Sequence, residues 1–166
     1  MKTLLAWIGL TDVRASENNP EAGLGPIGQV LQSRKFDRVV LLDNLTETQS
    51  STYRAWLKGQ TKTPIEIRSA PLSGPTEFGE IYKTVIETII ELKKATLPEP
   101  TFTFHLSPGT PAMAAVWIIV SKTRFPAELI ESSKQVGVRT VSVPFDITAE
   151  FIPDLIRQTD KQLEKA

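Results

Sequence analysis

At residues 105–113 the chain reads His105-Leu106-Ser107-Pro108-Gly109-Thr110-Pro111-Ala112-Met113. Phe102, Phe104 and Leu106 alternate with other residues and predict a strand that ends at this point. Residues 112–121 are mostly apolar and predict a helix. The sequence therefore predicts a strand, a sharp turn and a helix in direct succession.

Strand and helix patterns alternate along the rest of the chain. Further strands are expected at 3–8, 38–42 and 65–67, and further helices at about 26–33, 46–59 and 75–94, with a polar stretch at 11–25. This alternation predicts an α/β fold with a mostly parallel sheet and helices on both faces. Two more strands, 127–131 and 139–143, are separated by only seven residues, so they are expected to pair antiparallel as a hairpin at the sheet edge.

The chain has 166 residues, the length of one domain. We expect this domain to cover residues 1–148. Residues 149–166 are amphipathic and are expected to form a helix that closes the domain or connects it to an effector absent from this chain. The apolar run at 3–8 is too short to span a bilayer or to act as a signal peptide, so we expect a cytoplasmic protein without a membrane partner.

Charge and composition exclude several classes of protein. Lys plus Arg and Asp plus Glu number 19 each, so no overall positive field is present to bind duplex nucleic acid. The chain has no Cys and one His, which excludes thiol catalysis, zinc–sulfur sites and a His-rich metal centre. We expect neither a metal nor a cofactor.

Ligands of open α/β sheets bind beyond the carboxyl ends of the strands. The loops after the first, second and fourth strands, at 9–16, 43–46 and 107–110, therefore hold the candidate residues. In the loop at 107–110, after the fourth strand, Gly109 permits close backbone approach and the following helix offers N–H groups to an anion such as phosphate. A branched side chain at Gly109 is expected to block that ligand while the domain stays folded. The alternative is that Ser107 or Thr110 merely caps the helix.

Three other features have both a functional and a structural interpretation. Gly23–Gly28 matches the dinucleotide pattern G-x-G-x-x-G and raises a nicotinamide-dependent or other nucleotide-dependent enzyme as an alternative, but the pattern does not follow the first strand directly and contains Pro26. His105 is either a general base or a histidine hydrogen-bonded under a neighbouring helix. Asp12 and Asp43 either form an acid–base pair in the crevice, or cap helices and bind ribose hydroxyls.

The stretch 105–113 resembles the strand-four signature of CARF (CRISPR-associated Rossmann fold) domains, in which an apolar strand runs into a Gly-Thr turn closely followed by Met. Phe78-Gly79-Glu80-Ile81-Tyr82 upstream and Phe125-Pro126-Ala127-Glu128-Leu129-Ile130-Glu131-Ser132-Ser133 downstream resemble more specifically the N-terminal sensor of RtcR-type regulators, which are AAA+ transcriptional activators of RNA-repair operons. The resemblance extends over about residues 1–148.

The resemblance implies a Rossmann-like domain that forms a two-fold homodimer and senses a cyclic or linear oligoadenylate across the dimer interface, as a regulatory module for an effector. A ring nuclease, which cleaves the cyclic ligand, is the alternative within the same fold. Pro111 departs from the family, in which many members have a polar or basic residue at this place. The ligand contacts that the resemblance implies come from Thr11, Asp12, Ser107, Gly109, Thr110 and Met113.

Overall fold

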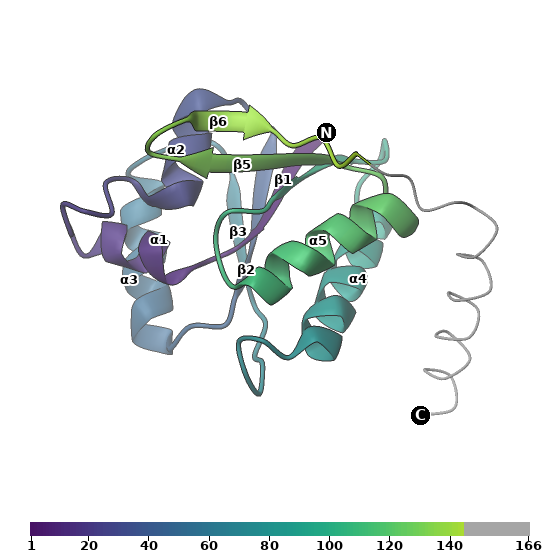
Figure 1. The fold of residues 1–166 in the computed structure, drawn as a ribbon, viewed down its shortest axis with the longest axis horizontal. Coiled ribbons are helices and arrows are strands. Elements are labelled where there is room, and N and C mark those ends of the chain that lie inside the picture. Colours follow the sequence, from purple (N-terminus) through teal and green to yellow (C-terminus); the bar gives the residue numbers. More distant parts are fainter. Residues whose placement is uncertain (145–166) are drawn as a thin grey trace.

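The computed structural model describes residues 1–144 of the chain (Figure 1). The end of the expected domain at residue 148 and the expected helix at 149–166 lie outside the described residues. Within them the elements are, in chain order, β1 (Lys2–Trp7), α1 (Leu10–Ser16), α2 (Gly25–Ser33), β2 (Arg38–Asp43), α3 (Glu47–Lys58), β3 (Ile65–Ser69), α4 (Phe78–Ala95), β4 (Thr101–His105), α5 (Pro111–Thr123), β5 (Glu128–Ser133) and β6 (Gly137–Thr140).

The strands form one mixed sheet in the order β3-β2-β1-β4-β5-β6. Leu4 in the central strand β1 pairs with Val39 of β2 on one side and with Thr103 of β4 on the other, both in parallel register. Only β5 and β6 are antiparallel, with Ile130 opposite Thr140. The predicted mostly parallel sheet and its antiparallel edge hairpin are therefore confirmed.

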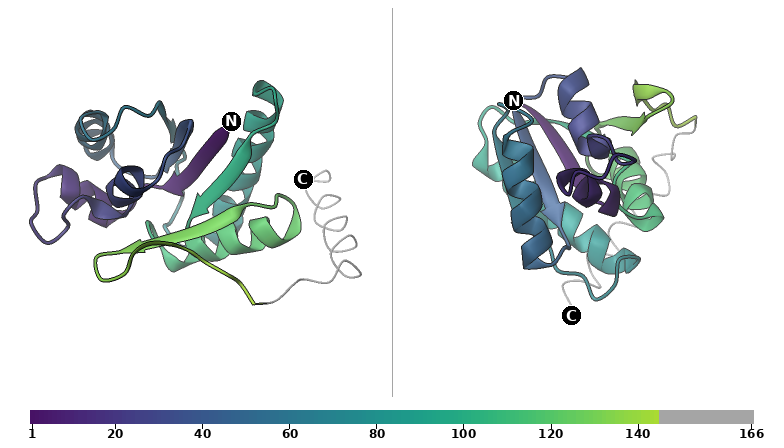
Figure 2. Two further views of the ribbon diagram at one scale, coloured as in Figure 1. Left: turned by 90° about the horizontal axis from the view of Figure 1, so that it is seen from above. Right: turned by 90° about the vertical axis from the view of Figure 1, so that its left-hand side faces the viewer.

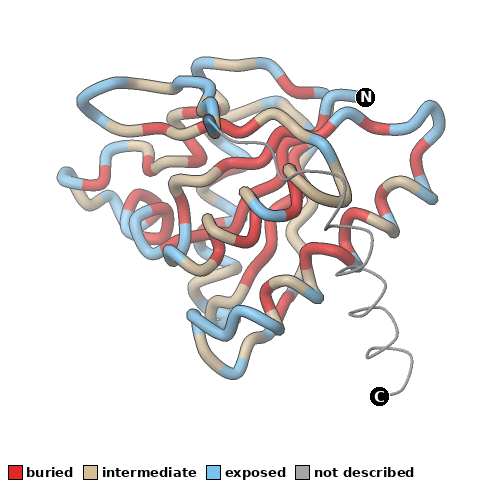
Figure 3. The backbone as a smooth tube through the Cα atoms, turned by 45° about the vertical axis from the view of Figure 1, so that its right-hand side comes forward, coloured by how far each residue is buried: buried red, intermediate tan, exposed pale blue. Residues whose placement is uncertain are grey.

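Helices cover both faces of the sheet, as predicted, because successive side chains of a strand point to opposite faces. Leu5 and Trp7 of β1 pack in the hydrophobic cluster formed with α4 and α5. Leu4 and Ala6 pack in the second cluster, with α1, α2 and α3. Figure 2 shows the sheet between these two groups of helices, and Figure 3 shows that its central strands are buried.

Helix α1 corrects the sequence-based prediction, which left residues 11–25 as a polar stretch without regular structure. The chain turns into α1 at Leu10, directly after β1. Val13 of this helix is buried in the cluster on this face of the sheet, Ala15 is buried beside Gly25 of α2, and Arg14 is exposed. Thr11 and Asp12 therefore lie in the first turn of a helix and not in an open loop.

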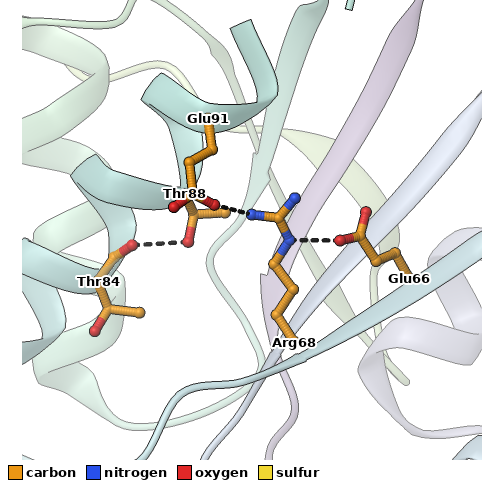
Figure 4. A network of polar contacts seen from close by, with 5 residues as sticks. All are labelled: Glu66, Arg68, Thr84, Thr88 and Glu91. Atoms are coloured by element: carbon orange, nitrogen blue, oxygen red, sulfur yellow. Dashed lines mark hydrogen bonds and ion pairs between the residues drawn. The ribbon is translucent and has the colours of Figure 1, made fainter. Parts of the chain in front are cut away.

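The edge strand β3 is tied to α4 through Arg68 (Figure 4). The Arg68 guanidinium donates to Glu66 at 2.6 Å and to Glu91 of α4 at 2.8 Å. Beside it, the Thr88 hydroxyl donates to the Thr84 carbonyl oxygen at 2.8 Å. Charged side chains on an edge strand oppose pairing with the edge of another molecule, so this network protects that side of the sheet.

Within residues 1–144, no helix has both the length and the apolar composition needed to cross a lipid bilayer.

Candidate ligand-binding site

A cleft of about 430 Å³ lies at the carboxyl ends of β1, β2 and β4. We call it the strand-end cleft. It is lined by all six residues that the sequence analysis selected: Thr11, Asp12, Ser107, Gly109, Thr110 and Met113. The structure thus brings together residues that are about one hundred positions apart in the sequence. Pro26, which belongs to the Gly23–Gly28 pattern, and Pro75 also line the cleft, although the sequence analysis did not select either as a ligand contact.

The loops after β1 and β4 contact each other through glycine backbone. A Cβ atom built on Gly9 would lie 2.6 Å from the amide nitrogen of Gly109. Gly109 itself has φ +92°, and a Cβ there would lie 2.5 Å from Sδ of Met113. A side chain at Gly109 is therefore strained whatever ligand is present, which removes the basis for expecting the domain to tolerate a branched residue there.

Thr110 is the N-cap residue of α5, and its side chain connects this helix to the segment before α4. Its Oγ1 accepts from the Met113 amide at 3.4 Å and donates to the Pro75 carbonyl oxygen at 2.8 Å. The capping role considered from the sequence is thus present. The amides of Ser107, Gly109 and Ala112 nevertheless have no hydrogen-bond partner among residues 1–144. Several free amides in one turn form a suitable environment for an anion.

Asp12 is fully buried and holds two segments of backbone together. Its Oδ2 accepts from the Gly9 amide and its Oδ1 from the Ile27 amide at the start of α2, both at 3.0 Å. Burial raises the pKa of this carboxyl from 3.8 to about 7, although both backbone hydrogen bonds act in the opposite direction. Asp12 therefore fixes the backbone beside the cleft through these hydrogen bonds, while its own side chain exposes essentially no surface.

Asp43 does not join Asp12 as an acid–base pair. Its Oδ1 accepts from the Leu45 amide at 2.7 Å, and its Oδ2 accepts from the Ser50 hydroxyl. It lines a separate surface pocket beside α3, to which Asp12 does not contribute. The two carboxylates therefore do not share a site.

His105 is a buried structural residue, as its second interpretation predicted. Its Nε2 lies 2.9 Å from the Ser132 hydroxyl, which in turn donates to the Pro26 carbonyl oxygen at 3.3 Å. Burial lowers the pKa of His105 from 6.5 to about 3, so the imidazole is neutral at physiological pH. The Ser132 amide also donates to Oγ of Ser107 at 2.7 Å, which fixes the turn after β4 to β5. Among residues 1–144 no group of three His, Asp or Glu side chains is arranged to hold a metal ion.

A second cavity of about 510 Å³ adjoins the strand-end cleft and shares Thr11 and Pro26 with it. We call it the hairpin groove, because residues 22–26 form one wall and residues 132–135, at the turn between β5 and β6, form the other. Sequence reasoning did not find it. The pairing of these two segments depends on tertiary contacts that leave no local pattern.

The G-x-G-x-x-G stretch lines this groove but differs from a dinucleotide loop in two ways. Helix α1 separates it from β1, whereas the dinucleotide fingerprint follows the first strand directly. The Ile27 amide at the start of α2 already donates to Asp12, and a Cβ on Gly25 would lie 2.9 Å from Oδ1 of that residue. Gly25 thus serves the packing of α1 against α2.

No protein-family model and no curated protein matches the chain, but solved structures do. Enterococcus italicus Csm6, bound to cyclic hexa-2'-fluoro-hexa-dAMP, superposes with a TM-score of 0.70 at 17% identity, over 98% of this chain and 45% of Csm6. Vibrio cholerae VC1899 gives a TM-score of 0.62 at 13% identity, over 88% of this chain and 34% of that protein. Can2 from Sulfobacillus thermosulfidooxidans, in complex with cyclic tetra-adenylate, gives a TM-score of 0.57 at 12% identity, over 81% of this chain and 33% of Can2.

What these three structures share with the chain is the arrangement of sheet and helices. The chain has a Rossmann-like fold. It spans less than half the length of each of the three proteins.

In a Rossmann-like sheet the ligand crevice opens where the strand order reverses, because the loops on its two sides leave toward opposite faces. Here the chain builds β1, β2 and β3 in one direction and then returns to place β4 on the other side of β1. The strand-end cleft lies at this β1–β4 switch point, which the general rule for the fold identifies as the ligand-binding position.

Proposed function

We propose that this chain is a CARF-like sensor domain that binds a cyclic or linear oligoadenylate in the strand-end cleft and signals its occupancy to an effector. The observation that carries this proposal is the convergence of all six residues implied by the CARF resemblance into one cleft at the β1–β4 switch point. Csm6 and Can2, which share the fold, were solved with cyclic oligoadenylates bound.

The chemistry of the cleft suits a nucleotide. Ser107 and Gly109 line the cleft, and their amides, which have no partner among residues 1–144, can donate to a phosphate. Leu45 and Pro26, both partly exposed, add apolar surface against which a base can pack. Of the described residues that line the cleft, none has a positively charged side chain. Phosphate binding would therefore depend on backbone donors, which favours a compact ligand over a long nucleic acid.

The proposal includes a two-fold homodimer with one ligand on its axis. One copy of the cleft offers few donors for the several phosphates of an oligoadenylate, and two copies facing each other would double them. Leu10, 63% exposed at the mouth of the cleft, provides apolar surface for such a contact. As its subtype within the CARF domains, we propose that the chain is the sensor of an RtcR-type transcriptional regulator of RNA repair. Such a regulator works in the cytoplasm.

The test is titration calorimetry of the full chain with cyclic tetra-adenylate, cyclic hexa-adenylate, their linear counterparts and NAD, combined with light scattering. We expect one oligoadenylate to bind per two chains, and the molar mass of the protein to rise to that of the dimer on saturation. We expect no binding of NAD. Chromatography of the ligand after incubation reports any ring opening. A chain that binds none of the oligoadenylates, or that binds NAD instead, would contradict the proposal.

A further inference from the structure

The hairpin groove is a preformed cavity. The Gln29 side-chain amide crosses from α2 to donate to the Ser133 carbonyl oxygen at 2.7 Å, and the Ser132 hydroxyl donates to the Pro26 carbonyl oxygen at 3.3 Å. These two hydrogen bonds fix the spacing between the groove's walls. The entropy cost of ordering the groove when a ligand binds is therefore small.

The groove continues the strand-end cleft. Thr11 and Pro26 line both cavities, and Thr11 is exposed. Each cavity alone has the volume of a small-molecule site. A ligand made of linked units can place one unit in the cleft and extend over Thr11 and Pro26 into the groove.

The two cavities differ in charge. Lys134 is the only charged residue among the described residues that line the groove, and no described residue with a positive charge lines the cleft. Lys134 is exposed and forms no ion pair within residues 1–144.

Among the described residues that line the groove, Lys134 offers the only positively charged donor to an anion. The Lys134 side chain lies next to Gly23, where a built Cβ would be 3.8 Å from Cε of the lysine, so no side chain there comes between the lysine and the groove. The Ile27 amide at the start of α2 is already bound to Asp12.

We propose that the hairpin groove is a second subsite for the oligoadenylate, in which Lys134 binds the phosphate that follows the nucleotide held in the strand-end cleft. This inference rests on the proposed function. It assigns length selectivity to the groove: an adenylate of two or more units reaches Lys134, and a mononucleotide in the cleft does not.

The experiment compares the full parent chain with Lys134→Gln, which removes the charge, and Lys134→Arg, which keeps it. Lys62→Gln is the matched control, because Lys62 is also exposed and without an ion pair within residues 1–144 but lies between α3 and β3, away from the groove. Each protein is titrated with 5′-AMP, linear tri-adenylate and cyclic tetra-adenylate at several salt concentrations, and thermal unfolding checks that the variants are folded.

We expect Lys134→Gln to weaken binding of the tri-adenylate and the cyclic tetra-adenylate about tenfold, and to reduce the slope of log K against log salt for the tri-adenylate by about 0.7. Binding of 5′-AMP should be unchanged. Lys134→Arg and Lys62→Gln should behave like the parent.

The failures of the two proposals are distinguishable. If the parent binds an oligoadenylate and folded Lys134→Gln matches it in affinity and salt slope, the second subsite is wrong while the proposed function stands. An equal loss in Lys62→Gln, or an equal loss for 5′-AMP, would also overturn the subsite. If the parent binds no oligoadenylate, the proposed function fails and the subsite fails with it.

Discussion

The backbones of Gly9 and Gly109 are in direct contact, and this contact leaves no room for a side chain on Gly9. Gly9 precedes α1 and Gly109 precedes α5, so this contact joins two of the loops that line the strand-end cleft. The width of the cleft therefore depends on two residues without side chains.

Gly9→Ala should destabilise the domain by about 1–3 kcal/mol, because the added methyl group would overlap the Gly109 amide and the two loops would have to separate. Backbone strain is not the cause, since Gly9 has φ −101°. The control is Gly79→Ala in α4, where a Cβ meets nothing within 4 Å; it should stabilise the domain by up to about 1 kcal/mol. Urea unfolding measures both, and equal stabilities for the two variants would contradict the prediction.

Asp12 should make stability depend on pH in the direction opposite to that of most carboxylates. Its folded pKa of about 7 lies above its ordinary value of 3.8, so the folded state binds the proton more tightly. The resulting stabilisation is complete below about pH 4 and is lost as the pH rises through 7. Asp12→Asn cannot ionise, and its NH₂ group would face a backbone N–H group.

We therefore expect Asp12→Asn to cost about 1–3 kcal/mol at pH 4.5 and distinctly less at pH 8. Urea unfolding of parent and variant at both pH values gives the difference directly, and contributions from other carboxylates cancel in it. A difference that stays constant with pH, or grows toward pH 8, would show that the Asp12 carboxyl does not titrate in this range.

His105 should stay neutral over the whole physiological range. Burial lowers its pKa to about 3, below the ordinary value of 6.5, so the stability associated with the neutral ring is present above pH 6.5 and is lost as the pH falls toward 3. His105 is the only histidine, which makes its NMR signal unambiguous. The imidazole Hε1 resonance should not move between pH 8 and pH 5 in the folded domain, and a midpoint near 6.5 would argue against this burial.

Thr110→Val should lower the free energy of unfolding by about 1 kcal/mol. The variant keeps the branched shape but loses the N-cap hydroxyl, which is hydrogen-bonded to the Met113 amide and the Pro75 carbonyl oxygen. Thr110→Ser keeps the hydroxyl and should lie close to the parent. Chemical unfolding ranks the three proteins. If valine and serine gave the same stability, the hydrogen bonds of Thr110 would not contribute.

The sheet could be predicted because its strands carry their own signals. Val39, Val40 and Leu41 form a run that is apolar on both faces of β2. The helix predicted at about 46–59 is α3, which begins with a capping box between Thr46 and Gln49. The six candidate site residues could be predicted to meet because parallel strands deliver their following loops to one edge of the sheet.

Two features could not be predicted, because tertiary contacts create them. Helix α1 has seven residues, too few for stability in isolation, and is held in part by the hydrogen bond from the Ile27 amide to Asp12. The hairpin groove depends on Gln29 reaching Ser133, 104 positions later in the chain. Neither interaction leaves a local pattern in the residues that it positions.

The place of β1 in the sheet also sets an order of events during synthesis. Leu4 pairs with Val39 on one side and with Thr103 on the other, so β1 and β2 can associate early on the ribosome, while the second edge of β1 has to wait for β4. Contacts so distant along the chain slow folding. Until Thr101–His105 are available to pair, β1 therefore keeps one edge of unpaired backbone N–H and C=O groups, and such an edge can pair with a strand of another molecule.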